Sequence, residues 1–217
     1  MVNKIKTTAH GDTAIVDIEG EIGIPESEHY SDNVRLGKIA QDFRNSLNEI
    51  AGIKASTTIV NIRSTGGNVD DAMLVYKALK LLDSKVVTRC FGYCGSAATI
   101  IAQAASCGCR EILDTSLYLI HRCTIDVRGN IFDIESAREM LDNRDRQIAE
   151  IYAMGTTKNG APDFLELMSF NNGAGKWLSP QETIAVGLAD RIVTYEEIEI
   201  YNASVPLWKR VKKKIGL

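Results

Sequence analysis

Strand-like and helix-like patterns alternate along this chain, and that alternation limits the folds that it can adopt. Short apolar runs rich in β-branched residues predict strands at 13–20, 57–62, 85–91, 117–121 and 189–194. Apolar residues at helical spacing predict helices at 33–51, 69–82, 95–105, 130–154 and 162–168, and a Ser-Pro-Gln-Glu capping box predicts another from 179 to 187. Such alternation indicates an α/β fold with a largely parallel sheet.

The bulk composition predicts one soluble domain. The 217 residues are 45% hydrophobic and 24% charged, and we expect residues 1–200 to form a single α/β domain. The net charge of −3 argues against a nucleic-acid partner. We expect residues 201–217, with their basic run from Lys209 to Lys214, to form a solvated tail. Because the sequence shows no signal peptide and no apolar stretch of membrane length, we expect a cytoplasmic protein without a membrane partner.

The cysteines predict reduced thiols and no metal centre. Their number, five, is odd, and the chain shows no export signal. The pair Cys107 and Cys109 lacks the CxxC spacing of a metal site, and His121 is the only histidine near it in the sequence. We therefore expect small apolar packing roles for these residues, with no metal and no cofactor in the protein.

Three short motifs, each at the end of a predicted element, suggest chemistry. Ser96 lies between Gly95 and Ala97 at the start of a predicted helix, where free N–H groups and the helix dipole favour an oxyanion. The pair Gly66-Gly67 follows the strand 57–62, and His121 ends the strand 117–121. A nucleophile, a base and a glycine-rich loop are the parts of a serine acyl-transfer site. Each motif taken singly also has an interpretation without chemistry: Ser96 as a helix cap, His121 as a core histidine and Gly66-Gly67 as an ordinary turn.

The motifs resemble those of one known family when they are taken in order. Residues 60–69 resemble the strand and S-P-G-G-x-V loop of the Clp protease proteolytic subunit, and residues 92–99 resemble its G-x-A-A-S-M-G-A turn. Residues 119–121 resemble its M-I-H strand end, and residues 177–182 and 187–190 resemble its F-L-S-A-P-E-A and Y-G-L-V-D segments. The order and spacing agree over roughly 57–193.

The resemblance implies a fold and an activity. The fold is a crotonase-like α/β spiral of β-β-α units with a long protruding handle helix, here starting at Asn130. The activity is that of a serine endopeptidase that cleaves peptides, unfolded proteins or capsid-associated proteins through an acyl-enzyme. Carried over by position, Ser96 is the nucleophile and His121 the general base, and the backbone N–H groups of Gly67 and Ala97 form the oxyanion hole. The family also implies a ring of six or seven subunits, single or stacked through the handle.

The chain departs from the family at three places. The position of the triad aspartate is Gly175, and the Gln-Pro after the histidine is Arg122-Cys123. Asn171, Asn172 and Asp126 are the candidates to orient the histidine in its place, and the sequence does not choose among them. Without such a substitute, an aspartate installed at 175 is expected to speed the reaction.

The third departure is at the start of the chain. The strand 13–19 begins almost at once, without the family's long axial segment, as in Clp-like peptidases of phages and prophages. Because of this difference, the sequence does not decide whether an ATPase unfoldase is a partner.

Two other functions remain open at this point. One is an acyl-CoA enzyme of the crotonase superfamily, which shares the fold and the oxyanion hole but uses acids on a thioester. The spacing of Ser96 and His121 speaks against it. The other is a non-catalytic ring or capsid scaffold derived from a peptidase, and glycine at position 175 is its best support.

Overall fold

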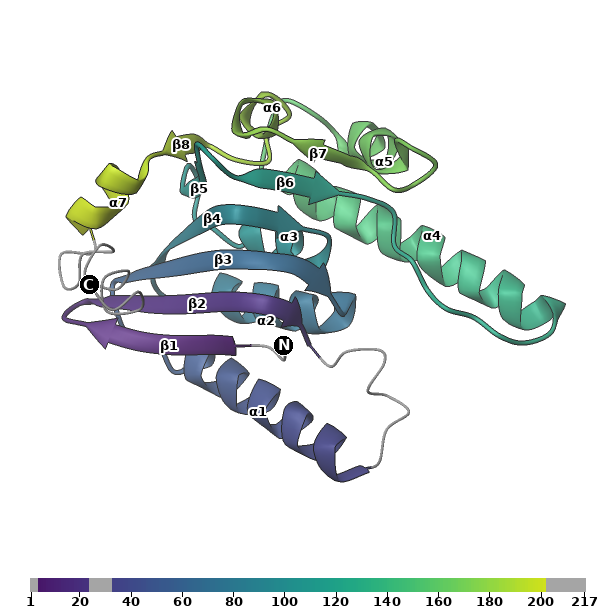
Figure 1. Ribbon diagram of the computed structural model, residues 1–217, viewed down its shortest axis with the longest axis horizontal. Coiled ribbons are helices and arrows are strands. Elements are labelled where there is room, and N and C mark those ends of the chain that lie inside the picture. The colour runs from purple at the N-terminus through teal and green to yellow at the C-terminus, as the bar shows by residue number, and fades with distance from the viewer. Residues whose placement is uncertain (1–3, 24–32, 202–217) are drawn as a thin grey trace, which may run out of the picture.

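Residues 4–23 and 33–201 are described by a computed structural model (Figure 1). The predicted basic run from Lys209 to Lys214 lies outside these residues. No helix in the described ranges has both the length and the apolar character needed to cross a bilayer.

Strands and helices alternate as the sequence predicts. The strands are β1 (Lys4–His10), β2 (Thr13–Ile22), β3 (Thr57–Gly67), β4 (Lys85–Gly95), β5 (Arg110–Leu113), β6 (Leu117–Ile120), β7 (Lys176–Leu178) and β8 (Arg191–Val193). The helices are α1 (Asn33–Ala51), α2 (Val69–Lys80), α3 (Ala97–Ala102), α4 (Ile131–Met154), α5 (Ala161–Ser169), α6 (Pro180–Ala185) and α7 (Tyr195–Tyr201). Four of these elements, β1, β5, β7 and α7, were not predicted. The strands β5 and β7 are too short to show a period.

The sheet is largely parallel, and its strand β4 has two successive neighbours. The order is β1-β2-β3-β4-β5-β8, with only the β1–β2 and β6–β7 pairs antiparallel. The first part of β4 pairs with β5 through Thr88 to Cys90, and its last part pairs with β6 through Tyr93 to Gly95. The sheet therefore divides along β4, and the β6 branch runs toward the edge where β3 and β4 end (Figure 1).

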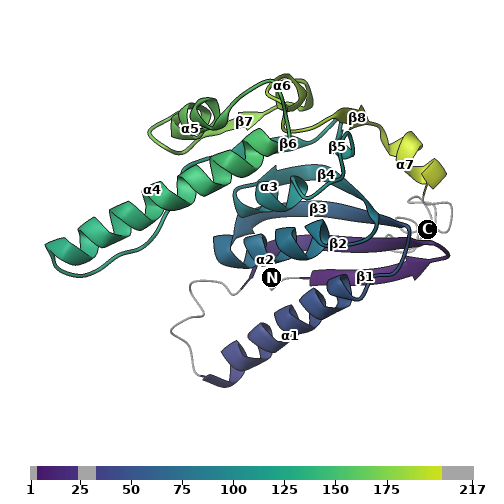
Figure 2. The same ribbon diagram turned by 180° about the vertical axis from the view of Figure 1, so that it is seen from behind.

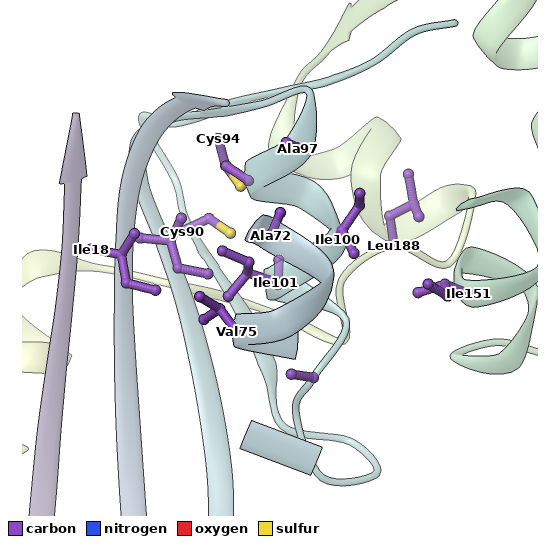
Figure 3. Close-up of a cluster of buried hydrophobic side chains, with 14 of the residues drawn as sticks. Ile18, Ala72, Val75, Cys90, Cys94, Ala97, Ile100, Ile101, Ile151 and Leu188 are labelled. Carbon is purple, nitrogen blue, oxygen red and sulfur yellow. The ribbon is translucent and has the colours of Figure 1, made fainter. Parts of the chain in front are cut away.

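The core lies between this sheet and helices α2 and α3, which cover one face of it together with α1 (Figure 2). Alternate residues of β2 point into the core, and Val16, Ile18 and Ile22 are fully buried there. Figure 3 shows Ile18 facing Val75 and Ile101, which come from α2 and α3. Burying each side chain of this size contributes about 1.5–3 kcal/mol, so this layer holds α3 firmly behind the sheet.

Helix α4 extends beyond the rest of the domain, as the resemblance implied (Figure 1). Its start is fixed by a capping box between Asn130 and Asp133. Its last turns are buried against the core, through residues that include Ile148, Ala149 and Tyr152. Its first turns expose large apolar side chains, namely those of Ile131, Phe132, Ile134 and Met140. The second half of α4 thus packs on the domain, whereas the first half is not covered by any of the residues that the structure describes.

Candidate active site

Three neighbouring parallel strands bring the predicted site residues to one edge of the sheet. In the register, Ser64 of β3 is paired with Cys94 of β4, and Gly95 of β4 is paired with Leu119 of β6. Because parallel strands end at the same edge, the residues that end or follow these strands lie together. These residues are Gly67, Ser96 and His121.

Ser96 has a strained backbone and a side chain that does not cap the helix. Its φ and ψ angles are 54° and −131°, a region that residues other than glycine rarely adopt and that costs about 1–3 kcal/mol. Its hydroxyl makes no capping hydrogen bond to α3, so the alternative of a helix-capping serine is wrong. Its backbone N–H donates to the carbonyl of Leu119 at 2.9 Å. The surrounding fold therefore holds a strained turn in which the Ser96 hydroxyl makes no helix-capping hydrogen bond.

The carbonyl of Ser96 fixes the turn from the other side. It accepts hydrogen bonds from the backbone N–H of Thr99 at 2.9 Å and from the Thr99 hydroxyl at 2.6 Å. Since that hydroxyl has given its only hydrogen to Ser96, the Tyr152 hydroxyl donates to it, at 2.6 Å. Burial raises the pKa of the Tyr152 phenol, so the group stays a neutral donor. Through this chain the serine turn is tied to helix α4.

The glycine pair is required by close backbone contacts. A Cβ atom at Gly66 would lie 2.5 Å from the Cβ of Ser96 and 2.9 Å from the backbone nitrogen of Ala97. A Cβ atom at Gly67 would lie 2.3 Å from the carbonyl oxygen of Ile22. Both glycines also have positive φ angles, 103° and 144°. The end of β3 can approach the serine turn this closely only because Gly66 carries no side chain, and it can lie against Ile22 of β2 only because Gly67 carries none.

All four predicted site residues line one small cavity. Its volume is about 60 Å³, and its wall includes Gly67, Ser96, Ala97 and His121. Ala97 is the first residue of α3, so its N–H has no partner within the helix. Ser96 and His121 are both described by the structure, and no hydrogen bond joins their side chains. Such bonds are often long before a substrate binds.

A wider cleft continues from this cavity. Its volume is about 290 Å³, and it shares Gly67, Val69, Cys123 and Thr124 with the small cavity. It runs on to residues of β2 and α4, and so forms an open approach to Ser96.

The imidazole of His121 is oriented by a backbone carbonyl. Its Nδ1 atom lies 2.5 Å from the carbonyl oxygen of Arg122. A carbonyl oxygen can only accept, so Nδ1 carries the proton and Nε2 keeps a lone pair for accepting one. This is the protonation pattern that a general base needs when its Nε2 faces a nucleophile.

None of the three side chains that the sequence offered to orient His121 hydrogen-bonds to it in the described structure. Asn171 uses its side-chain nitrogen to donate to the carbonyl of Gly175 at 3.2 Å. Asn172 and Asp126 are exposed, and neither bonds to the imidazole in the described structure. The orienting group is the Arg122 carbonyl, a backbone atom.

Position 175 does lie beside His121, but it has no room for a side chain. A Cβ atom there would lie 2.8 Å from the Cβ of His121 and 1.9 Å from the carbonyl oxygen of Ile120. The φ angle of Gly175 is 74°, which disfavours any other residue. The loop conformation therefore leaves no room for an aspartate at 175, and we now expect Gly175→Asp to disturb the loop instead of speeding the reaction.

A buried carboxylate, Asp145, lies close to the histidine and was missed by the sequence reasoning. Asp145 lies in the charged run Arg144-Asp145-Arg146 of α4, yet it is 3% exposed. Its two oxygens accept from the backbone N–H of Cys123 at 2.8 Å and from the guanidinium of Arg122 at 3.2 Å. Burial and then the Asp145 charge raise the pKa of the Cys123 thiol to about 12.

A sequence signal for Asp145 exists. It lies at helical spacing with Leu141, Ile148 and Tyr152, on the apolar stripe of α4. A charged residue on such a stripe is expected to be paired, because an unpaired buried charge is costly.

The comparisons with known proteins decide the family. The sequence profile of the Clp protease family matches residues 37–196. The chain belongs to the Clp protease family. Over 142 residues it is 32% identical to the ATP-dependent Clp protease proteolytic subunit 1 of Protochlamydia amoebophila. The aligned part covers 64% of this chain and 66% of that subunit, so the chain spans about two thirds of this relative.

Other members of the Clp protease family are more distant. The ATP-dependent Clp protease proteolytic subunit 2 of Pseudomonas aeruginosa is 24% identical over 159 residues, which cover 73% of this chain and 77% of that subunit. A solved structure, that of a ClpP1 mutant from Listeria monocytogenes, superposes with a TM-score of 0.64 at 20% identity. It covers 84% of this chain and 92% of the Listeria chain. This structural likeness confirms the predicted crotonase-like α/β fold of the Clp protease type.

Proposed function

We propose that this chain is a serine endopeptidase subunit that cleaves peptides and unfolded or capsid-associated proteins through an acyl-enzyme on Ser96. The observation that carries the proposal is the cavity that Ser96 shares with His121, Gly67 and Ala97. Membership of the Clp protease family supports the same reaction class. It also favours peptide substrates over the acyl-CoA thioesters of the wider superfamily.

The reaction begins when the Ser96 oxygen attacks the scissile carbonyl. His121 takes the serine proton on Nε2, the atom left unprotonated by the bond from Nδ1 to the Arg122 carbonyl. The same proton then goes to the leaving amine as the C–N bond breaks. Water hydrolyses the resulting ester by the same steps in reverse order, with His121 again accepting and returning a proton.

The negative oxygen of the intermediate would be held by backbone N–H groups. Ala97 offers its N–H at the start of α3, and Gly67 offers one from the loop that contacts the serine turn. Losing one such donor costs about 10²–10³ in turnover in other enzymes, so the backbone path of the glycine pair should affect the rate strongly.

The assembly we propose is a ring of six or seven subunits, single or stacked through α4. The exposed apolar side chains at the start of α4, such as Phe132, support it, because the described residues of the domain do not cover them. The relatives are named as subunits of ATP-dependent proteases, and we include an ATPase unfoldase as a candidate partner. Residues 1–200 would form the domain of each subunit, with 201–217 as its tail.

A fluorophosphonate probe tests the peptidase, because it forms a covalent bond only with an activated serine. We expect the wild type to be labelled at Ser96, and Ser96→Ala and His121→Gln to lose labelling and the hydrolysis of short fluorogenic peptides. Ser96→Ala should change the free energy of unfolding by less than about 1 kcal/mol. Ser136→Ala is the control, since Ser136 is exposed on α4. Labelling that survives in Ser96→Ala would refute the proposed nucleophile.

A non-catalytic scaffold is the second candidate, and Gly175 favours it. This position lies beside His121 but cannot hold the family's acid. Ring assembly by a wild-type protein that takes up no probe and cleaves no peptide would support the scaffold instead of the enzyme.

A further inference from the structure

We propose that Asp145 replaces the missing acid by acting on His121 through the peptide bond between Arg122 and Cys123. The inference rests on the proposed function, because it assigns a positioning residue to that reaction. Asp145 touches no substrate and acts only through the peptide group next to the base.

The geometry is a chain of two hydrogen bonds through one amide. The carbonyl of this amide accepts from Nδ1 of His121 at 2.5 Å, and its N–H donates to Oδ1 of Asp145 at 2.8 Å. A hydrogen bond to the N–H of an amide makes its carbonyl a better acceptor, because linked hydrogen bonds polarise one another. The negative charge of Asp145 therefore strengthens the bond that fixes the imidazole, although the carboxylate does not contact it.

Burial makes this polarisation effective. The Asp145 side chain is 4% exposed, so little solvent screens its charge. Its second oxygen pairs with Arg122, whose guanidinium is also held by the hydroxyl of Ser169 at 2.8 Å. The carboxylate is thus anchored by Arg122 on one oxygen and bonded to the peptide by the other.

Other charged groups near the site are paired elsewhere. Lys176, which faces Ile120 across β6 and β7, forms an ion pair with Glu182. Arg144, which precedes Asp145, forms an ion pair with Asp70. Within the described structure, Asp145 is the carboxylate that hydrogen-bonds to the segment after His121.

The decisive variant is Asp145→Asn, which keeps an oxygen to accept from Cys123 and removes the charge. We expect the maximal rate of fluorophosphonate labelling to fall by about 10- to 100-fold, less than the roughly 10⁴-fold loss that follows when the directly bonded aspartate of a Ser-His-Asp protease is replaced by asparagine. The concentration for half-maximal rate should change by less than about two-fold, because the residue does not touch the probe.

A second measurement does not depend on activity. Nitrogen NMR of isotope-labelled histidine reports which ring nitrogen carries the proton, and the His121→Gln variant identifies the signal of His121. We expect the neutral wild-type imidazole to carry its proton on Nδ1. In Asp145→Asn the weaker carbonyl acceptor should give a mixture of the Nδ1–H and Nε2–H forms. A purely structural role for Asp145 would not change this signal.

The control is Asp190→Asn, since Asp190 forms a similar ion pair with Arg110 and lines neither cavity at the candidate site. It should lower stability and leave both the labelling rate and the His121 signal unchanged. If Asp145→Asn does not fold, the double variant Arg122→Gln with Asp145→Asn removes both charges of the pair and avoids an unpaired buried charge. It should show the same changes.

The outcomes separate this inference from the proposed function. A folded Asp145→Asn protein with wild-type labelling and a wild-type His121 signal overturns the inference, and so does an equal loss in Asp190→Asn. A wild type that is never labelled but shows the expected change of the NMR signal refutes the peptidase and leaves the role of Asp145 in place.

Discussion

Nδ1 of His121 is hydrogen-bonded to the carbonyl oxygen of the next residue, Arg122, at 2.5 Å. The base of the proposed reaction is therefore oriented by its own chain and not by a side chain from another segment. The bond survives only while the backbone from 121 to 123 keeps its path. That path is held by the bond from the Cys123 N–H to Asp145 and by the bond from the Arg122 N–H to the carbonyl of Gly173 at 3.1 Å.

The Cys123 thiol should resist alkylation at neutral and mildly alkaline pH. Burial and the Asp145 charge raise its pKa to about 12, so the reactive thiolate is a minute fraction at pH 8. We expect iodoacetamide to modify Cys123 at least about 100-fold more slowly than the exposed Cys107, with the rate rising with pH toward 12. Peptide mass spectrometry measures both rates in one sample.

The Asp145→Asn variant tests whether the charge of Asp145 contributes to the raised pKa of Cys123. Removing a negative charge next to the thiol favours the thiolate, so the alkylation of Cys123 should become faster while that of Cys107 stays the same. An unchanged Cys123 rate would mean that the Asp145 charge does not reach the thiol.

Replacing Gly175 should destabilise the protein more than its φ angle alone explains. Gly92 has the same φ of 74°, but a Cβ atom there meets nothing closer than 3.5 Å, whereas one at 175 meets the Ile120 carbonyl at 1.9 Å. We expect Gly92→Ala to cost about 1–2 kcal/mol and Gly175→Ala about 3 kcal/mol or more. Urea unfolding compares the two variants, and equal costs would show that the 175 loop can move aside.

Gly66→Ala should slow fluorophosphonate labelling at Ser96. The added methyl group would lie 2.5 Å from the Cβ of Ser96, so the serine turn must shift. A shift near 1 Å costs on the order of 10² in rate, and we expect a loss of that size in fluorophosphonate labelling. Gly108→Ala is the control, because its φ is also positive and its Cβ would meet nothing within 4 Å. Wild-type labelling in Gly66→Ala would refute the tight contact.

Phe132→Glu should reduce the mass of the assembly by about two-fold if rings stack through α4. Phe132 is 73% exposed on the projecting half of the helix, where a charge would oppose apolar contact. Light scattering at micromolar concentration measures the mass. Leu81→Glu is the control, since Leu81 is 85% exposed at the end of α2 and should not affect stacking. A monomeric wild type would contradict the ring itself.

The sequence predicted which residues lie together at the carboxyl ends of the strands better than it predicted where each strand ends. Gly67, Ser96 and His121 were found because each lies where a buried strand ends, and parallel strands end together. The strands β3 and β4 continue to Gly67 and Gly95, beyond the predicted ends at 62 and 91, because the backbone there pairs with neighbouring strands although the residues form no apolar run. Pairing of this kind depends on tertiary contacts and leaves no periodic pattern.

The orienting group of His121 could not be found from residue types at all. It is a carbonyl that every residue has, and only the fold directs it at the imidazole. The contacts of Asp145 were hidden for another reason, since the residue is flanked by two arginines in a charged run. Its place on the apolar stripe of α4 is visible in the sequence, but the contact with the segment after His121 is not.

The shape of the loop before β7 has a consequence for how this protein can evolve. Asn171, Asn172, Gly173 and Gly175 all have positive φ angles, and the last of them is pressed against the backbone of β6. A single substitution to aspartate at 175 therefore meets a steric barrier, and a side chain fits there only if several residues of the loop change together. Single substitutions can thus adjust the present contact between His121 and the Arg122 carbonyl far more easily than they can replace it with an acid at 175.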